Sequence, residues 1–124
     1  MESAISVYRC VADASSREEV RAVIGAGVIQ NFEFTYELCW KFMKRWININ
    51  ADPTAADGVA RRQLFRLAAQ NRLIDDVDKW MEFQAARNQT HHIYNQDVAD
   101  EVLAVALESF PFMQDFQKSL ERRL

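Results

Sequence analysis

Both histidines of the chain fall in one short stretch, ARNQTHHIYN at residues 86–95. Arg87 lies just before His91 and His92, and Tyr94 lies just after them. A histidine titrates near neutral pH and can take a proton from a ribose 2′-hydroxyl. An arginine can hold a phosphate through two parallel hydrogen bonds and stabilise the charge that builds on it. Together these residue types favour metal-independent cleavage of RNA through its own 2′-hydroxyl.

The spacing leaves open which histidine does this work. On one continuous helix Arg87 and His91 share a face, whereas Arg87 and His92 lie about 140° apart. If residues 92–94 are extended instead, His92 and Tyr94 project to the same side. A nearby twofold axis could also bring Arg87 and His92 of two chains together. The simplest alternative is that the histidines only cap carbonyls at a helix end.

No metal or cofactor is expected from the sequence. Cys10 and Cys39 are isolated and lack the cysteine and histidine spacing of a zinc site. Asp97 and Asp100 are expected in the cap and first turn of a helix, where acids suit the helix dipole. They do not form a carboxylate cluster suited to two magnesium ions.

Composition predicts one all-α domain spanning residues 1–124. Hydrophobic residues make up 49% of the chain and charged residues 27%, with only three glycines and two prolines, which favours helices around a core. The net charge of −3 argues against non-specific binding of duplex nucleic acid, so any RNA contact must be local. Lone cysteines, no signal-peptide pattern and no long apolar run predict a cytoplasmic protein without a membrane segment.

We expect an up-and-down antiparallel bundle of four to five helices. The predicted helices cover residues 2–14, 17–49, 56–71, 77–90 and 96–124. Asp75 or Asp76 is expected to cap the fourth helix, and Asn95 the fifth. Pro53 marks the clearest loop, and Pro111 should kink or split the last helix.

The long helix predicted at residues 17–49 is apolar on most sides. Ser16 and Glu19 form a capping box at its start, and Gly25 and Gly27 indicate a break or a close helix contact. Its later part carries the following apolar residues: Phe32, Phe34, Tyr36, Leu38, Cys39, Trp40, Phe42, Met43, Trp46 and Ile47. A helix of this kind must be covered on a second face. We predict a homodimer formed through it; the alternative is a central helix wrapped by its own neighbours.

One row of charges survives on this helix. Glu33, Glu37 and Lys41 follow one another at intervals of four residues. Glu37 before Lys41 is the favourable orientation for an ion pair. The row is either a solvated face whose ion pair contributes little or the lining of a cleft between subunits.

Two separated motifs resemble those of the nucleotidyltransferase substrate-binding protein family, a branch of the HEPN superfamily. The first lies in GVIQNFEFTYELCWKFMKRW at residues 27–46. The second is Arg-x4-His-x-Tyr, formed here by Arg87, His92 and Tyr94. The resemblance extends over essentially the whole chain, and residues 1–25 and the loop at residues 50–60 contribute little to it.

The resemblance implies a dimeric helical bundle that pairs with a minimal nucleotidyltransferase, as a heterotetramer or larger complex. In toxin–antitoxin members, the bundle is a metal-independent RNase toxin whose arginine and histidine meet at the dimer interface. The antitoxin silences it by transferring AMP to the motif tyrosine. By resemblance, Arg87 binds phosphate, His92 is the general acid and base, and Tyr94 is modified. The motif thus selects His92, whereas helix geometry alone favours His91.

The chain departs from the family pattern after the tyrosine. Relatives often place an acid there, whereas this chain reads Tyr94-Asn95-Gln96. A carboxylate that could assist AMP transfer is therefore missing at that point, although Asp97 follows. The departure does not affect the fold, because Asn95 can still cap a helix.

A second function class is a binding subunit that performs no chemistry itself. In this alternative the dimer cleft holds a nucleotide or another substrate for the partner transferase. The residues expected to line the cleft, beside Arg87 and His92, are Glu33, Glu37, Trp40, Lys41, Asn88 and His91. A third alternative is a structural helical adaptor with no site.

Overall fold

The computed structural model describes residue 5 and residues 18–51 and 56–123. Its helices are α2 (Glu18–Asn50), α3 (Arg61–Gln70), α4 (Val77–Asn88), the 3₁₀ helix η1 (Thr90–His92) and α5 (Gln96–Glu121). No strand occurs in these ranges, and the predicted all-α class is confirmed. The helix predicted at residues 2–14, together with Ser16 and Pro53, lies outside the described residues.

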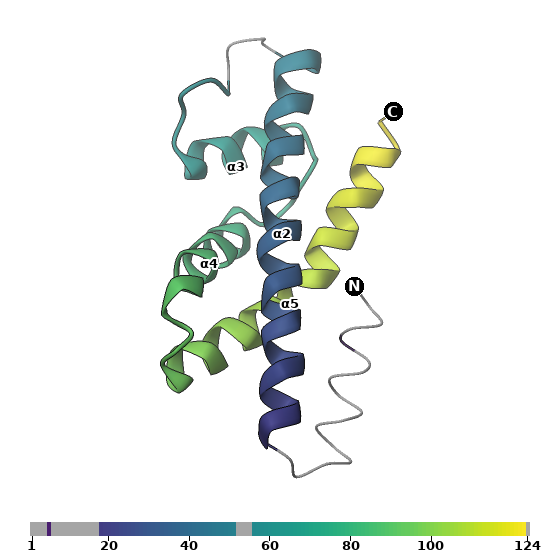
Figure 1. Ribbon diagram of the computed structural model, residues 1–124. Coiled ribbons are helices and arrows are strands. Elements are labelled where there is room, and N and C mark those ends of the chain that lie inside the picture. Colours follow the sequence, from purple (N-terminus) through teal and green to yellow (C-terminus); the bar gives the residue numbers. More distant parts are fainter. Residues whose placement is uncertain (1–4, 6–17, 52–55, 124) are drawn as a thin grey trace.

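The long helix α2 is the axis of the bundle. It packs against α3 and α5, and α4 packs between α3 and α5. Figure 1 shows α3 and α4 on one side of α2 and α5 crossing it. Within the described ranges, no helix combines the length and the hydropathy needed to cross a membrane.

One face of α2 forms the core of the bundle. Six buried residues recur along it at intervals of three or four positions: Val28, Phe32, Tyr36, Cys39, Met43 and Ile47. Such spacing places them in one stripe along the helix. Burial raises the pKa of the Cys39 thiol to about 12, so this cysteine stays protonated at neutral pH and acts as a small apolar side chain.

Aromatic rings join the four long helices in the interior. The ring centroids of Tyr36 on α2 and Phe65 on α3 are 6.5 Å apart. Phe65 lies 5.8 Å from Trp80 on α4, which lies 6.1 Å from Phe116 on α5. Tilted and edge-on ring pairs of this kind contribute about 0.5–1.5 kcal/mol each beyond the area they bury. The core therefore fixes α4, and with it Arg87, relative to α2.

A second face of α2 carries another set of apolar residues. We call Phe34, Leu38, Phe42 and Ile49 the outer stripe. All four side chains are exposed, with Phe34 at 67% and Ile49 at 70%. The prediction that α2 is apolar on two faces is confirmed, and within the described residues only one of these faces is covered.

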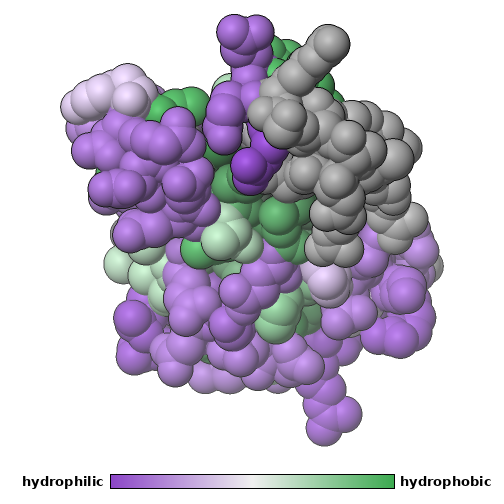
Figure 2. Space-filling view, turned by 90° about the horizontal axis from the view of Figure 1, so that it is seen from below, coloured by the Kyte–Doolittle hydropathy of each residue, from purple (hydrophilic) through white to green (hydrophobic). Residues whose placement is uncertain are grey.

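The end of the bundle where α2 begins shows hydrophobic residues at its surface between hydrophilic ones (Figure 2). Val23 on the first turns of α2 is 73% exposed. The half-buried Ile93 and Leu103 line a groove of about 430 Å³ between α2 and the start of α5, with the buried Ile29 at its base.

Two predicted helix boundaries need correction. The third helix begins at Arg61 rather than near residue 56, because a turn with Gly58 at φ 68° precedes it. A left-handed φ of this kind favours glycine and does not fit a helix start. The fourth helix ends at Asn88, and η1 follows it.

The predicted interruptions do not divide the helices. α2 continues through Gly25 and Gly27, and a side chain at Gly27 would meet open space rather than a packed helix. α5 remains one helix through Pro111 and is not split, although it changes direction part-way along its length (Figure 1).

Two predicted helix caps are present. The Asp76 carboxylate accepts a hydrogen bond from the Lys79 amide at 3.1 Å. The Asn95 side chain accepts hydrogen bonds from the Asp97 and Val98 amides at 3.0 and 3.4 Å. These caps satisfy otherwise unpaired amides at the starts of α4 and α5.

Candidate functional site

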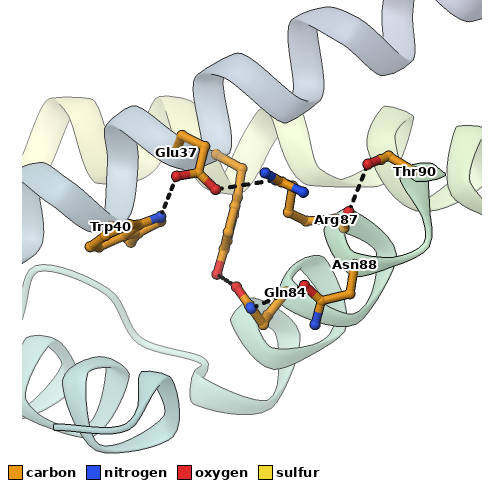
Figure 3. A network of polar contacts seen from close by, with 7 residues as sticks. Glu37, Trp40, Gln84, Arg87, Asn88 and Thr90 are labelled. Atoms are coloured by element: carbon orange, nitrogen blue, oxygen red, sulfur yellow. Dashed lines mark hydrogen bonds and ion pairs between the residues drawn. The ribbon is translucent and has the colours of Figure 1, made fainter.

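Arg87 is held against α2 by an ion pair with Glu37. Arg87 Nε donates to Glu37 Oε1 at 3.1 Å, and the two side chains are 24% and 32% exposed. Trp40 Nε1 donates to Glu37 Oε2, also at 3.1 Å. Figure 3 shows the carboxylate between the indole and the guanidinium. Both Glu37 oxygens thus accept hydrogen bonds, and the carboxylate fixes the direction in which Arg87 points.

This arrangement corrects the expected pairing of Glu37 with Lys41. Lys41 is exposed on the next turn of α2, and its Nζ lies 5.7 Å from the centroid of the Trp40 ring. Glu33 and Lys41 instead border an open groove of about 470 Å³ on the α2 surface, together with Glu37 and Phe34. The charged row is therefore exposed to solvent at Glu33 and Lys41, and its middle member, Glu37, pairs with Arg87.

A second series of hydrogen bonds runs beneath the ion pair. The Tyr36 hydroxyl donates to Gln84 Oε1, and Gln84 Nε2 donates to Asn88 Oδ1 at 3.4 Å. Burial raises the pKa of Tyr36, and the positive charges of Arg61 and Arg87 oppose that rise. Tyr36 remains a protonated donor at neutral pH. Asn88 thus adjoins the Arg87 network, as Figure 3 shows.

Arg61 is a member of this site that the sequence patterns do not indicate. Its guanidinium carbon lies 3.5 Å from the centroid of the Trp40 ring, within the range of a cation–π contact. Its Nε is buried without a hydrogen-bond partner. Arg61 starts α3, 21 residues after Trp40, so no periodicity links the two residues, and only the packing of α3 on α2 brings them together.

The histidines lie beyond the end of α4. Thr90 Oγ1 donates to the Arg87 carbonyl at 2.8 Å, which fixes the turn into η1. The His92 amide donates to the Gln89 carbonyl at 2.9 Å, and the His92 carbonyl accepts from the Asn95 amide at 3.0 Å. Residues 92–94 thus form the end of η1 and a turn, so the alternative in which they are extended does not occur.

His92 and Tyr94 are nevertheless neighbours. Their ring centroids are 6.0 Å apart and the rings are nearly perpendicular. His91 and His92 are exposed, and Tyr94 is 85% exposed. A partner can therefore reach all three side chains.

The predicted site residues fall into two groups within one chain. Glu37, Trp40 and Arg87 share one hydrogen-bonded network, and Glu33 and Lys41 lie at its border. Asn88 belongs to the neighbouring series with Tyr36 and Gln84. His91, His92 and Tyr94 form the exposed group after α4. Within one chain the Arg87 side chain contacts Glu37, and the His92 ring contacts Tyr94. In the part of the chain that the structure describes, no three histidine, cysteine or acidic side chains are grouped to hold a metal ion.

This fold and these motifs match a known family. The model of the family described as nucleotidyltransferase substrate binding protein like matches residues 1–122. The chain belongs to this family. The match confirms the resemblance that residues 27–46 and the Arg-x4-His-x-Tyr motif indicate.

Two similar proteins come from Haemophilus influenzae. "Probable ribonuclease HepT" is 41% identical over 88 residues, which cover 68% of this chain and 59% of the relative. The aligned part of the chain thus spans about three fifths of that relative's length. The structure of HI0074, described as the fold of a substrate-binding domain of a nucleotidyltransferase, is 30% identical with a TM-score of 0.85. That alignment covers 97% of this chain and 93% of the other.

The Glu37–Arg87 pair is expected to stabilise the fold measurably. Glu37→Gln and Arg87→Met, made singly and together, should give a coupling free energy of about 1 kcal/mol, because the pair is shielded from solvent. Urea unfolding of the wild type, the two single variants and the double variant measures this coupling free energy. The exposed pair of Arg62 and Asp78, 3.4 Å apart, is the control and should give less than about 0.5 kcal/mol with Arg62→Met and Asp78→Asn. Equal coupling in the two pairs would show that Glu37 does not fix Arg87.

Proposed function

We propose that the chain is the toxin of a toxin–antitoxin pair, a metal-independent endoribonuclease with a composite site at a homodimer interface. The observation that carries this proposal is the position of Arg87. Its partner Glu37 lies on α2 beside the outer stripe residues Phe34 and Leu38, with which it borders one groove. A chain packed on that stripe lies next to Arg87. The relative named as a probable ribonuclease supports the same class of activity.

The outer stripe supports the dimer. Exposed apolar side chains at this spacing form a continuous patch, which is uncommon on a monomer. A second copy related by a twofold axis presents the same stripe and covers the patch. Arg87 of one chain and His92 of the other then form each site, which agrees with the separate contacts of these side chains within one chain.

The proposed reaction uses the RNA's own nucleophile. His92 takes the proton of the 2′-hydroxyl, and the 2′-oxygen forms a bond to the adjacent phosphorus. The bond from phosphorus to the 5′-oxygen breaks, and that oxygen receives a proton, which leaves a 2′,3′-cyclic phosphate. Arg87 donates hydrogen bonds to the non-bridging oxygens, where negative charge builds.

Tyr94 is the proposed point of control by the partner. A minimal nucleotidyltransferase transfers AMP from ATP to the Tyr94 hydroxyl; the new bond joins that oxygen to the α-phosphorus, and pyrophosphate leaves. The ring is exposed and lies beside His92. The attached AMP is bulky and anionic, so it fills the space that RNA would occupy and its phosphate pairs with the Arg87 guanidinium in place of the RNA phosphate.

A non-catalytic substrate-binding subunit is the second candidate. The description of HI0074 as a substrate-binding domain of a nucleotidyltransferase favours it. In this case the groove beside Glu33, Glu37 and Lys41 holds a nucleotide for the partner. Isothermal titration of nucleotides into the complex with the partner then gives a saturable heat, and the chain alone leaves RNA intact.

The purified chain is expected to cleave a pool of tRNA and mRNA in EDTA. His92→Ala and Arg87→Ala should each reduce cleavage at least a hundredfold, because each removes one half of the proposed chemistry. His91→Ala is the matched control and should retain cleavage. Electrophoresis of the RNA measures the products, after mass spectrometry has shown that Tyr94 is unmodified. Cleavage that survives His92→Ala, or an absence of cleavage by the unmodified wild type, contradicts the proposal.

Two inactive variants are expected to restore each other. When Arg87→Ala and His92→Ala chains are co-expressed, half of the dimers are mixed and each mixed dimer holds one intact composite site. Random pairing therefore gives about a quarter of wild-type cleavage. The same RNA assay measures it, with the two variants purified separately as the control. A site formed within one chain gives no recovery.

Incubation with the partner transferase and ATP is expected to add one AMP to the chain. Intact-mass measurement detects the addition, and peptide mapping should locate it at Tyr94. Tyr94→Phe should remain unmodified and active in the presence of the partner, since it keeps the ring and loses the nucleophilic oxygen. If AMP were added to Tyr94→Phe at another residue, that residue and not Tyr94 would be the point at which the partner regulates the chain.

A further inference from the structure

The second half of α2 carries positive charge without neighbouring acids along the helix. No aspartate or glutamate occurs between Leu38 and Asn50, whereas Lys41, Lys44 and Arg45 do. Trp40 lies among them, with Arg61 stacked on its ring. We call Lys41, Lys44, Arg45 and Arg61, with Trp40, the basic strip.

The basic strip forms an open surface on α2. Trp40, Lys41, Lys44 and Arg45 lie together there, next to Asn48 and Ile49. The strip adjoins Arg87, because Trp40 and Arg87 bind the same Glu37 carboxylate. From Glu37 to Arg45 the helix rises about 12 Å, so the strip extends away from Arg87 over that length.

The cations of the strip have no acidic partner within the described ranges. Arg62, Lys79 and Arg87 form ion pairs with acids, whereas among the described residues the four cations of the strip form none. Arg61 Nε is also buried without a hydrogen-bond partner. Isolated surface cations of the described chain, such as Arg66 and Lys118, form no ion pair either, so the strip is distinguished by the grouping of its cations beside Trp40.

Of the acids at the two ends of the strip, Glu37 is paired with Arg87, whereas Asp57 accepts a hydrogen bond from the neutral Asn48 amide at 3.4 Å and keeps its charge. A chain of net charge −3 thus groups four cations on one surface.

We propose that the basic strip binds the sugar–phosphate backbone of single-stranded RNA and leads it to Arg87. This inference rests on the proposed ribonuclease function and names the residues that hold its substrate. Cations grouped around an aromatic ring suit single-stranded nucleic acid. An acidic protein surface is the alternative that the test distinguishes.

The test measures RNA binding without cleavage. In a His92→Ala background, the anisotropy of a fluorescein-labelled, short oligouridylate is followed between about 50 and 200 mM salt. Lys44→Gln with Arg45→Gln should raise the dissociation constant about tenfold or more at the lower salt. The slope of log K against log salt should fall by about 1.4, since each lost contact to single-stranded nucleic acid removes about 0.7.

A matched pair of substitutions controls for net charge. Arg66→Gln with Lys118→Gln removes the same two charges from exposed positions on α3 and α5, outside the strip. It should leave the dissociation constant within about twofold. Circular dichroism and thermal unfolding compare the folding of all the chains. Sedimentation compares their oligomeric state, because Arg45 adjoins Phe42 and Ile49 of the outer stripe; a loss of RNA affinity counts for the strip only where the oligomeric state is unchanged. Equal losses in the two double variants would overturn the strip as a site.

The remaining outcomes separate this proposal from the proposed function. Wild-type cleavage that persists unchanged in the Lys44 and Arg45 variant, with unchanged RNA affinity, overturns the strip and leaves the nuclease standing. RNA binding that depends on the strip, in a chain that never cleaves, supports the strip and rejects the nuclease. If the variant loses affinity only for the purified nucleotidyltransferase, the strip is a protein-docking surface and the RNA proposal is wrong.

Discussion

The packing of α2 is the constraint on which the rest of the structure depends. This helix has apolar residues on two faces, and Glu33, Glu37 and Lys41 form a charged row beside the outer stripe. One face forms the aromatic core with α3, α4 and α5, and this fixes α4 at the distance where Arg87 reaches Glu37. The other face is the exposed outer stripe. The candidate site therefore lies between the covered and the uncovered face, which is the position expected of a site completed by a second chain.

The sequence predicts the helices well and the contacts between them poorly. Helix periodicity, sparse glycine and the caps at Asp76 and Asn95 are local signals, and the structure contains the elements they indicate within the described residues. The start of α3 was misplaced because residues 56–60 contain no strong helix breaker except Gly58, whose left-handed φ appears only in the folded chain. Arg61 could not be found at all, because its contact with Trp40 depends on how α3 packs on α2.

In the site, too, the sequence predicts the residues but not the contacts between helices. Arg87, His92 and Tyr94 were selected by a motif, and Glu37 by its interval from Glu33 and Lys41. The interval correctly placed Glu37 on the charged surface but paired it with Lys41, its neighbour on the same helix. In the structure a residue 50 positions away takes that place, since Arg87 Nε meets Oε1 and the Trp40 indole meets Oε2. Intervals within a helix describe neighbours along that helix only, and a partner from another helix can replace them when it is better shielded from solvent.

The Glu37–Arg87 contact is compatible with phosphate binding rather than opposed to it. A guanidinium has five N–H donors in a planar fork, and Glu37 accepts from the Nε donor. The two terminal nitrogens remain available to meet two phosphate oxygens in parallel. A carboxylate on Nε restricts rotation of the side chain, so less freedom is lost when phosphate binds. It also repels an anion that approaches from its own side. Phosphate should therefore approach Arg87 from the side away from Glu37, and in the proposed RNA-binding role the cations of the basic strip would offset that repulsion.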